Sequence, residues 1–135
     1  YTLPTTTMEK NFDVWNEKKK EIHGRGLAPF YHTREIWWCA LGVNIGFEQD
    51  GSGTEHQRPI LVLKGLSANT CLAVPLTASV HDHPLRPSVG VVDGKKAHAI
   101  LSQIRVVDTK RLIRKICTLD KKIFASIRKA AKDML

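Results

Sequence analysis

The chain has 135 residues, of which 21 are Lys or Arg and 13 are Asp or Glu, giving a net charge of +8. This length suits one domain with a small hydrophobic core, and no apolar run reaches the ~20 residues that cross a bilayer. We expect neither a membrane segment nor a secretion signal, since the N-terminus lacks a basic stretch followed by an apolar one. The charge favours a polyanionic partner, although a basic soluble surface accounts for it equally well.

The three cysteines lie far apart in the sequence, at Cys39, Cys71 and Cys117. An odd count without a C-x-x-C pair argues against a disulfide framework and against a zinc site. Each lies in or beside an apolar segment, so we expect small buried hydrophobic side chains. Cysteine usage of this kind is typical of a reducing cytoplasm.

Residues 1–33 are predicted to form a helical extension and a linker. Thr6 and Glu9 have the spacing of a capping box. Four apolar residues then follow the periodicity of one helical face: Met8, Phe12, Trp15 and Ile22. The charges at residues 17–21 are interpreted as a solvated face rather than a nucleic-acid contact. Glycines and a proline in residues 24–33 end the helix.

From residue 35 onward the pattern becomes that of short strands separated by turns. The predicted strands are 36–41, 60–63, 70–74, 89–92, 97–101 and 104–107. The unbroken apolar run at 60–63 indicates burial on both faces. Pro75 is expected to end the third strand, because proline belongs at an edge or a bulge. A polar, glycine-rich loop over 46–57 separates the first two strands.

The C-terminal part returns to helix. Asp108 or Thr109 is expected to cap a short helix, and Ile116 to lie in a brief strand. Asp120 then caps a last helix. Five residues form the apolar stripe of that helix: Ile123, Ile127, Ala130, Ala131 and Met134. The chain is therefore predicted to be α+β and mostly β, a small, strongly bent sheet or partial barrel with helices attached.

Four motifs stand in order along the chain. They are residues 34–38 (REIWW), 46–49 (GFEQ) followed by 58–63 (RPILVL), 74–77 (VPLT), and 101–112 (LSQIRVVDTKRL). In this order and spacing they resemble the MazF/PemK/Kid family of toxins, over residues 34–135. Three features depart from the family pattern: Glu35 replaces its common Gly-Asp pair, the loop between Glu48 and Arg58 is slightly expanded, and the N-terminal helix lies outside its compact core.

The resemblance implies a toxin domain over residues 34–135 with an SH3-like or CcdB-like barrel of antiparallel strands. It implies a type II toxin that inhibits growth as an mRNA interferase, an endoribonuclease that cleaves single-stranded RNA with some sequence preference. The implied partners are RNA, a second copy of the chain, and a cognate antitoxin whose acidic tail fills a basic groove. No metal or other cofactor is implied.

Arg58 is the first candidate for the catalytic site. RNA carries its own nucleophile, the 2′-hydroxyl, so the protein must align an in-line attack and stabilise the charge that develops on the phosphorus. The guanidinium offers a planar fork of donors to phosphate oxygens and stays cationic near neutrality. The resemblance also assigns Arg58 a role in proton transfer. The alternative is an arginine that merely precedes Pro59 at the start of a strand.

Thr77 and Glu48 complete the predicted catalytic set. The Thr77 hydroxyl can donate to a phosphate oxygen, and the resemblance places it beside Arg58; the alternative is a local hydrogen bond at a strand end. Glu48 can orient Arg58 or act as a base, or it is a solvated acid in a loop. His56 is a further candidate for the base because of its proximity in sequence.

Four residues are candidates for contacts with RNA. The resemblance assigns Gln49 to this group. Phe47 can stack on an unpaired base, or anchor its loop in the core. Gln103 and Arg105 are expected to alternate to one side of a strand whose other side carries Ile104 and Val106, and to meet RNA or a second subunit there.

Other interpretations of the sequence remain open. The His81-Asp82-His83 alternation suggests metal ligands, but no further ligand cluster accompanies it, so a solvated loop is favoured. A CcdB-like toxin that poisons gyrase through protein contacts would need no Arg58–Thr77 pair. A degenerate relative that binds RNA without cutting it would keep the same motifs.

Overall fold

A computed structural model describes residues 10–42, 44, 50–51, 56–79 and 83–135. In this part of the chain the elements are α1 (Phe12–His23), β1 (Glu35–Ala40), β2 (Gln57–Gly65), β3 (Thr70–Thr77), β4 (Ser88–Val92), β5 (Lys95–Ala99), the 3₁₀ turn η1 (Leu101–Gln103), β6 (Arg105–Asp108), the 3₁₀ turn η2 (Thr109–Arg111), β7 (Leu112–Thr118) and α2 (Lys121–Asp133). None of these helices is both long enough and apolar enough to cross a membrane.

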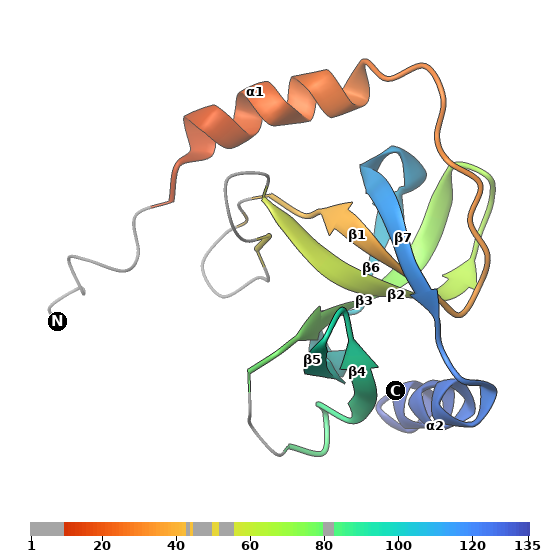
Figure 1. The fold of residues 1–135 in the computed structure, drawn as a ribbon. Helices are drawn as coiled ribbons and strands as arrows, with labels where there is room; N and C mark the ends of the chain where they lie inside the picture. The colour runs from red at the N-terminus through yellow and green to blue at the C-terminus, as the bar shows by residue number, and fades with distance from the viewer. Residues whose placement is uncertain (1–9, 43, 45–49, 52–55, 80–82) are drawn as a thin grey trace, which may run out of the picture.

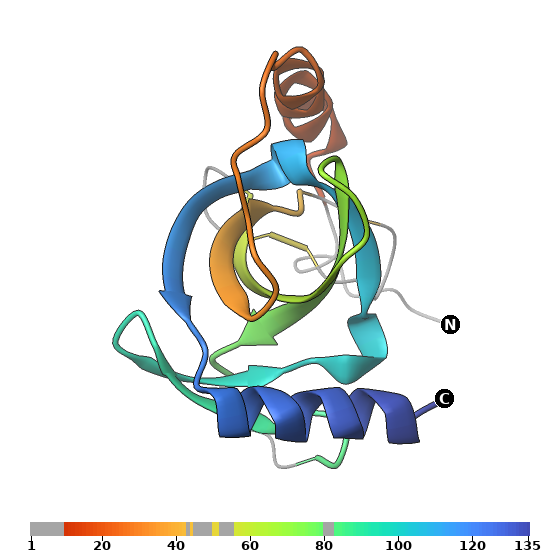
Figure 2. The same cartoon turned by 90° about the vertical axis from the view of Figure 1, so that its right-hand side faces the viewer.

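The strands form one antiparallel sheet that curls into a half-barrel (Figures 1 and 2). Their order is β4-β5-β3-β2-β1-β7, and β6 pairs with β3 beside β5. The helix α2 lies against the outside of the curl near β4 (Figure 2). The mostly β architecture and the bent antiparallel barrel predicted from the sequence are confirmed.

The central strand β2 is buried on both faces, as its apolar run predicts. Ile60 and Val62 pack into the core enclosed by the curled sheet. Leu61 and Leu63 point to the opposite face and pack into the core that α2 covers. Because successive side chains of a strand alternate, a run of four apolar residues supplies two cores at once.

Pro75 does not end its strand, contrary to the sequence-based expectation. The strand β3 continues to Thr77, and Pro75 lies opposite Ile60 of β2. The Pro75 carbonyl accepts a hydrogen bond from the Ile100 amide at 2.9 Å, on the side away from β2. Pro75 therefore lies between the part of β3 that pairs with β6 and the part that pairs with β5. Its missing N–H is on that side of the strand, so no hydrogen bond between β3 and β2 is lost.

The strands β4 and β5 form a hairpin closed by Asp93 and Gly94. Both residues have positive φ angles, +51° and +80°. Two successive positive φ values suit an Asp-Gly hairpin turn, because glycine meets no steric cost there and aspartate tolerates it. The hairpin lies against the end of β3, where Thr77 is paired with His98.

The alternation predicted for residues 103–106 begins later than expected. Gln103 ends η1, and β6 begins only at Arg105. Val106 is 54% exposed, whereas Val107 is buried. Because a 3₁₀ turn precedes the strand, the alternation starts at Arg105, which shares its side of the sheet with Val107.

The predicted C-terminal elements are confirmed, and one is longer than expected. The Asp108 side chain caps η2 by accepting from the Lys110 amide. The Asp120 side chain caps α2 in the same way. The apolar stripe of α2 packs on the core together with the buried Phe124. The brief strand at Ile116 is the seven-residue β7, which pairs along β1.

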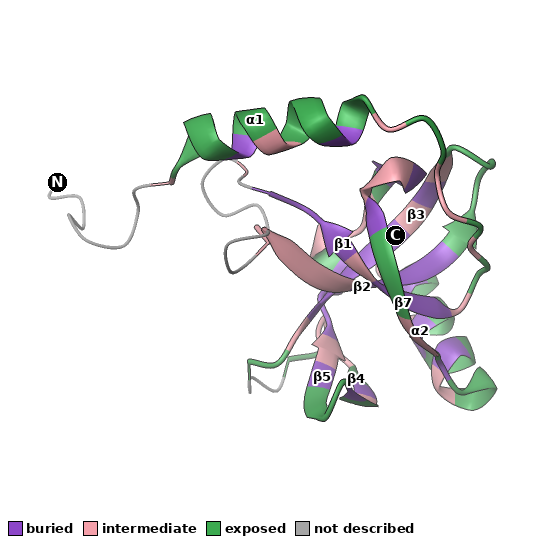
Figure 3. Ribbon diagram, turned by 45° about the horizontal axis from the view of Figure 1, so that its top comes forward, coloured by how far each residue is buried: buried purple, intermediate pink, exposed green. Residues whose placement is uncertain are grey.

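The N-terminal helix α1 lies across one end of the half-barrel (Figures 1 and 3). Asn11 caps it by accepting a hydrogen bond from the Val14 amide at 3.1 Å; the capping box expected at Thr6 and Glu9, and Met8 with it, lie outside the described residues. Trp15 and Ile22 are buried, as their spacing predicts. Phe12 is half exposed, so only part of the predicted face meets the barrel.

Candidate active site

Arg58 lies at the start of β2, opposite Cys39 of β1. Its Nε donates to the backbone carbonyl of Asp50 at 2.7 Å, and its Nη1 donates to the carbonyl of Leu76 at 3.1 Å. Burial lowers the pKa of Arg58 below its ordinary value, and the nearby Asp50 carboxylate partly offsets this change. The guanidinium is thus a half-buried cation whose plane is fixed by two backbone carbonyls.

Thr77 and Arg58 line the same cavity, which has a volume of about 210 Å³. The second hydrogen bond of Arg58 goes to Leu76, the neighbour of Thr77, so the ends of β2 and β3 bring the two residues together. The cavity is lined by Trp38, Arg58, Pro59, Leu76, Thr77, Ala78, Val92, Asp93, Lys95 and Ala97. The guanidinium and the hydroxyl give this cavity donors that suit an anionic group.

Besides Arg58 and Thr77, three residues with polar side-chain atoms line this cavity, and the sequence motifs did not predict them as site residues. Trp38 stands opposite Pro59 in the β1–β2 pairing, and its indole Nε1 is buried without an acceptor among the described residues. Asp93 and Lys95 come from the β4–β5 hairpin. The Asp93-Gly94 dipeptide is a strong hairpin signal, and it could have placed Lys95 at the start of a returning strand.

Two of the predicted RNA contacts lie apart from this cavity. Gln103 ends η1, and Arg105 lies opposite Ala73 on the other part of β3. Burial lowers the pKa of the half-buried Arg111, and the nearby charge of Arg105 lowers it further. The structure therefore brings Arg58 and Thr77 together but does not bring Gln103 or Arg105 to them.

Three predicted site residues, Phe47, Glu48 and Gln49, lie outside the described residues. His56 is described, and its ring lies against Trp15 with 5.6 Å between ring centroids rather than in the cavity.

His81 and Asp82 also lie outside the described part, while His83 Nδ1 accepts the Leu85 amide. Among described residues no three His, Cys, Asp or Glu side chains gather as metal ligands.

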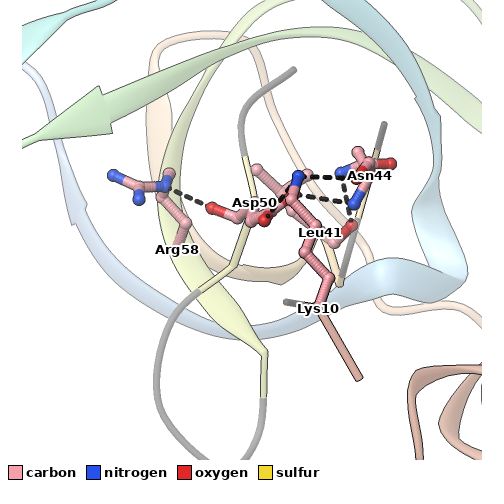
Figure 4. A network of polar contacts seen from close by, with 5 residues as sticks. All are labelled: Lys10, Leu41, Asn44, Asp50 and Arg58. Atoms are coloured by element: carbon pink, nitrogen blue, oxygen red, sulfur yellow. Dashed lines mark hydrogen bonds and ion pairs between the residues drawn. The ribbon is translucent and has the colours of Figure 1, made fainter. Parts of the chain in front are cut away.

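A polar network joins Arg58 to the N-terminal segment (Figure 4). The Asp50 carboxylate forms an ion pair with Lys10 at 3.0 Å and accepts a hydrogen bond from the backbone amide of Asn44 at 2.7 Å. Lys10 also donates to the carbonyl of Asn44 at 2.6 Å. The backbone at Asp50, which contacts Arg58, is therefore anchored from two directions.

The sequence over residues 32–135 matches the family described as PemK-like, MazF-like toxins of type II toxin–antitoxin systems. The chain belongs to this family. No curated protein sequence matches it at a significant level. The match leaves out α1, which is the part of the chain that the sequence motifs also left unexplained.

Solved structures of this family share the fold at low sequence identity. MazF from Deinococcus radiodurans is 19% identical with a TM-score of 0.62, covering 80% of this chain and 96% of that chain. The Mycobacterium tuberculosis toxin MazF-mt6 is 15% identical with a TM-score of 0.58, covering 74% and 94%. A mycobacterial endoribonuclease in complex with its cognate antitoxin is 14% identical with a TM-score of 0.58, covering 77% and 93%. These similarities establish a MazF-like fold.

Proposed function

We propose that the protein is a metal-independent endoribonuclease toxin that cleaves single-stranded RNA, with residues 34–135 as the toxin domain and residues 1–33 as an extension. The observation that carries the proposal is the shared cavity of Arg58 and Thr77. A fixed, half-buried guanidinium beside a hydroxyl is the arrangement that in-line attack on a phosphodiester needs. Membership of the toxin family supports the same conclusion.

In this reaction the 2′-oxygen of one nucleotide attacks the adjacent phosphorus, and the bond from phosphorus to the 5′-oxygen breaks. A base takes the 2′-hydroxyl proton, and an acid protonates the departing 5′-oxygen. The products are a 2′,3′-cyclic phosphate and a 5′-hydroxyl. Arg58 stabilises the negative charge that grows on the phosphate oxygens, and Thr77 donates its hydroxyl to one of them.

The identity of the base is a choice between Arg58, Glu48 and His56. Arginine is a poor base as a free side chain because its ordinary pKa exceeds ~12, although burial lowers the pKa here. His56 packs against Trp15 rather than lining the cavity, which argues against it. Comparing the pH–rate profiles of Glu48→Gln and His56→Gln with the wild type distinguishes these candidates.

The proposed partners follow from charge and from the structural neighbours. A net charge of +8 favours RNA as substrate and an acidic antitoxin segment as inhibitor. A mycobacterial neighbour was solved with its cognate antitoxin. A homodimer, with RNA bound along the interface, is also part of the proposal.

The test is cleavage of a single-stranded RNA by the purified protein in EDTA. We expect the wild type to cut and Arg58→Ala to lose at least about 100-fold in rate, because it loses the donor to the phosphate. Arg128→Ala, which removes an exposed arginine from α2, is the matched control and should cut like the wild type. Full activity of Arg58→Ala would refute the assignment, and a wild type that binds RNA or protein without cutting would support a non-catalytic toxin.

A further inference from the structure

The helix α1 lies outside the residues that match the toxin family, yet it packs on the segments that lead to Arg58. Trp15 is only 4% exposed. A Cβ atom on Gly42 would stand 1.8 Å from its indole, so the ring lies directly on the backbone at the end of β1. The same ring contacts His56, the residue before β2. Trp15 therefore covers the point where the two strands meet.

The backbone under Trp15 continues directly to Asp50. Gly42 donates to the His56 carbonyl at 3.1 Å and accepts from the Gly51 amide at 2.8 Å. A Cβ on Gly51 would stand 1.7 Å from the His56 carbonyl oxygen, so the chain passes there in close contact. Gly51 is the neighbour of Asp50, and the packing of Trp15 thus fixes one side of the Asp50 peptide.

Lys10, one residue before the cap of α1, fixes the other side. Its ammonium pairs with the Asp50 carboxylate at 3.0 Å and donates to the Asn44 carbonyl at 2.6 Å. The two side chains of the ion pair are only 17% and 29% exposed. Partial burial makes such a pair stronger than a solvated one, because water and salt screen it less.

The Asp50 carbonyl then accepts the Nε–H of Arg58 at 2.7 Å (Figure 4). The geometry points to α1 and the residues just before it as a positioning element, in which Lys10 and Trp15 hold the Asp50 carbonyl where it orients the Arg58 guanidinium toward the phosphate of bound RNA. This inference rests on the proposed nuclease function. It assigns Lys10, Trp15 and Asp50 a role in the reaction although none of them lines the cavity.

The expected consequence is on the rate of the chemical step. A guanidinium displaced by about 1 Å loses alignment with the transition state, and a displacement of that size lowers the rate by up to about 100-fold. After loss of the Lys10 side chain, the Asn44 backbone amide and the Gly42–Gly51 hydrogen bond still hold the Asp50 segment. Arg58 should therefore move by less than this, and we expect about a tenfold loss of kcat for Lys10→Ala. KM should change by less than about twofold, because the cavity lining is unaltered.

The experiment compares Lys10→Ala with two controls in the full chain. Lys10→Arg keeps the charge and should restore kcat. Lys20→Ala breaks an exposed ion pair with Glu17 on α1 and should behave like the wild type. Steady-state cleavage of a short single-stranded RNA gives kcat and KM. The NMR resonance of the Arg58 Nε–H, assigned by its loss in Arg58→Lys, reports its hydrogen bond without RNA.

The expected result is a lower kcat and a shifted Arg58 resonance in Lys10→Ala, with both controls unchanged. An unshifted resonance, or a kcat equal to that of Lys20→Ala, would overturn the proposal. If the wild type does not cut RNA at all, the proposed function fails, and the resonance alone decides whether α1 orients Arg58.

Discussion

The Thr77 hydroxyl oxygen accepts a hydrogen bond from the backbone amide of Ser79 at 3.1 Å. The local bond that a strand-end threonine commonly makes is therefore present. It uses one lone pair of the hydroxyl and fixes its oxygen, while the hydroxyl proton can still be donated to a phosphate.

Substitution of Thr77 should test the role of its hydroxyl. Thr77→Ser keeps the hydroxyl, and we expect its kcat/KM on single-stranded RNA to stay within about threefold of the wild type. Thr77→Val keeps the shape but removes the hydroxyl, and with it both the acceptor for Ser79 and the donor to phosphate; we expect a loss of about 100-fold. If Thr77→Val cleaves RNA at the wild-type rate, Thr77 only ends β3 and its hydroxyl has no role in the reaction.

Lys95 lies at the cavity and should contribute to RNA affinity rather than to chemistry. Lys95→Ala should weaken binding of a 2′-O-methyl RNA, which cannot attack itself, and lower the slope of log affinity against log salt by about 0.7. The adjacent Lys96 does not line the cavity and provides the control. Equal losses for Lys95→Ala and Lys96→Ala would indicate a general charge effect.

The sequence predicts more of the fold than of the candidate site. The unbroken apolar run of β2 and the Asp108 and Asp120 caps are local patterns, and they predicted the right elements. The start of β6 was misplaced because a 3₁₀ turn ends at Gln103, and no local propensity marks that turn.

Arg58 and Thr77 were predicted through motifs, whereas Trp38 and Lys95 depend on how distant strands meet. Trp38 reaches the cavity only because β1 pairs with β2, and Lys95 only because the hairpin lies at the end of β3. The coupling of Lys10 to Asp50 joins residues 40 positions apart, which no sequence period encodes.

Glu35 gives a prediction for stability against pH. Burial raises the pKa of this carboxyl, but hydrogen bonds from the His32 amide, Lys115 and Trp37 outweigh burial and lower the pKa below its ordinary value of 4.5. A depressed pKa in the folded state means that the charged carboxylate stabilises the fold above pH 4.5, and that this contribution disappears as pH falls through the lowered value.

Urea unfolding of Glu35→Gln should show this dependence. We expect it to be about 1–2 kcal/mol less stable than the wild type at pH 7, with most of the loss from hydrogen bonds to the carboxylate, because Lys115 is 44% exposed. The difference should shrink as the pH falls below 4.5. A difference that stays constant down to pH 3 would mean that packing, not charge, is responsible.

The cysteines should differ in reactivity. Burial raises the pKa of Cys39 to about 12 and of Cys71 to about 11, so both thiols stay protonated and inaccessible. Cys117 is half-buried, and its pKa is raised by burial as well. Labelling of the native protein at pH 8 should modify Cys117 first and the other two only after unfolding. Mass spectrometry that finds Cys39 labelled in the native state would contradict the buried position of β1.

The chemistry of the cut ends tests the central claim most directly. The wild type in EDTA should leave 2′,3′-cyclic phosphate and 5′-hydroxyl ends, which mass spectrometry of the fragments identifies. A 2′-deoxyribose at the cleaved position should abolish cutting there, because it removes the nucleophile. Fragments with 3′-hydroxyl and 5′-phosphate ends, or undiminished cutting at the 2′-deoxy position, would contradict 2′-hydroxyl attack at the Arg58–Thr77 cavity.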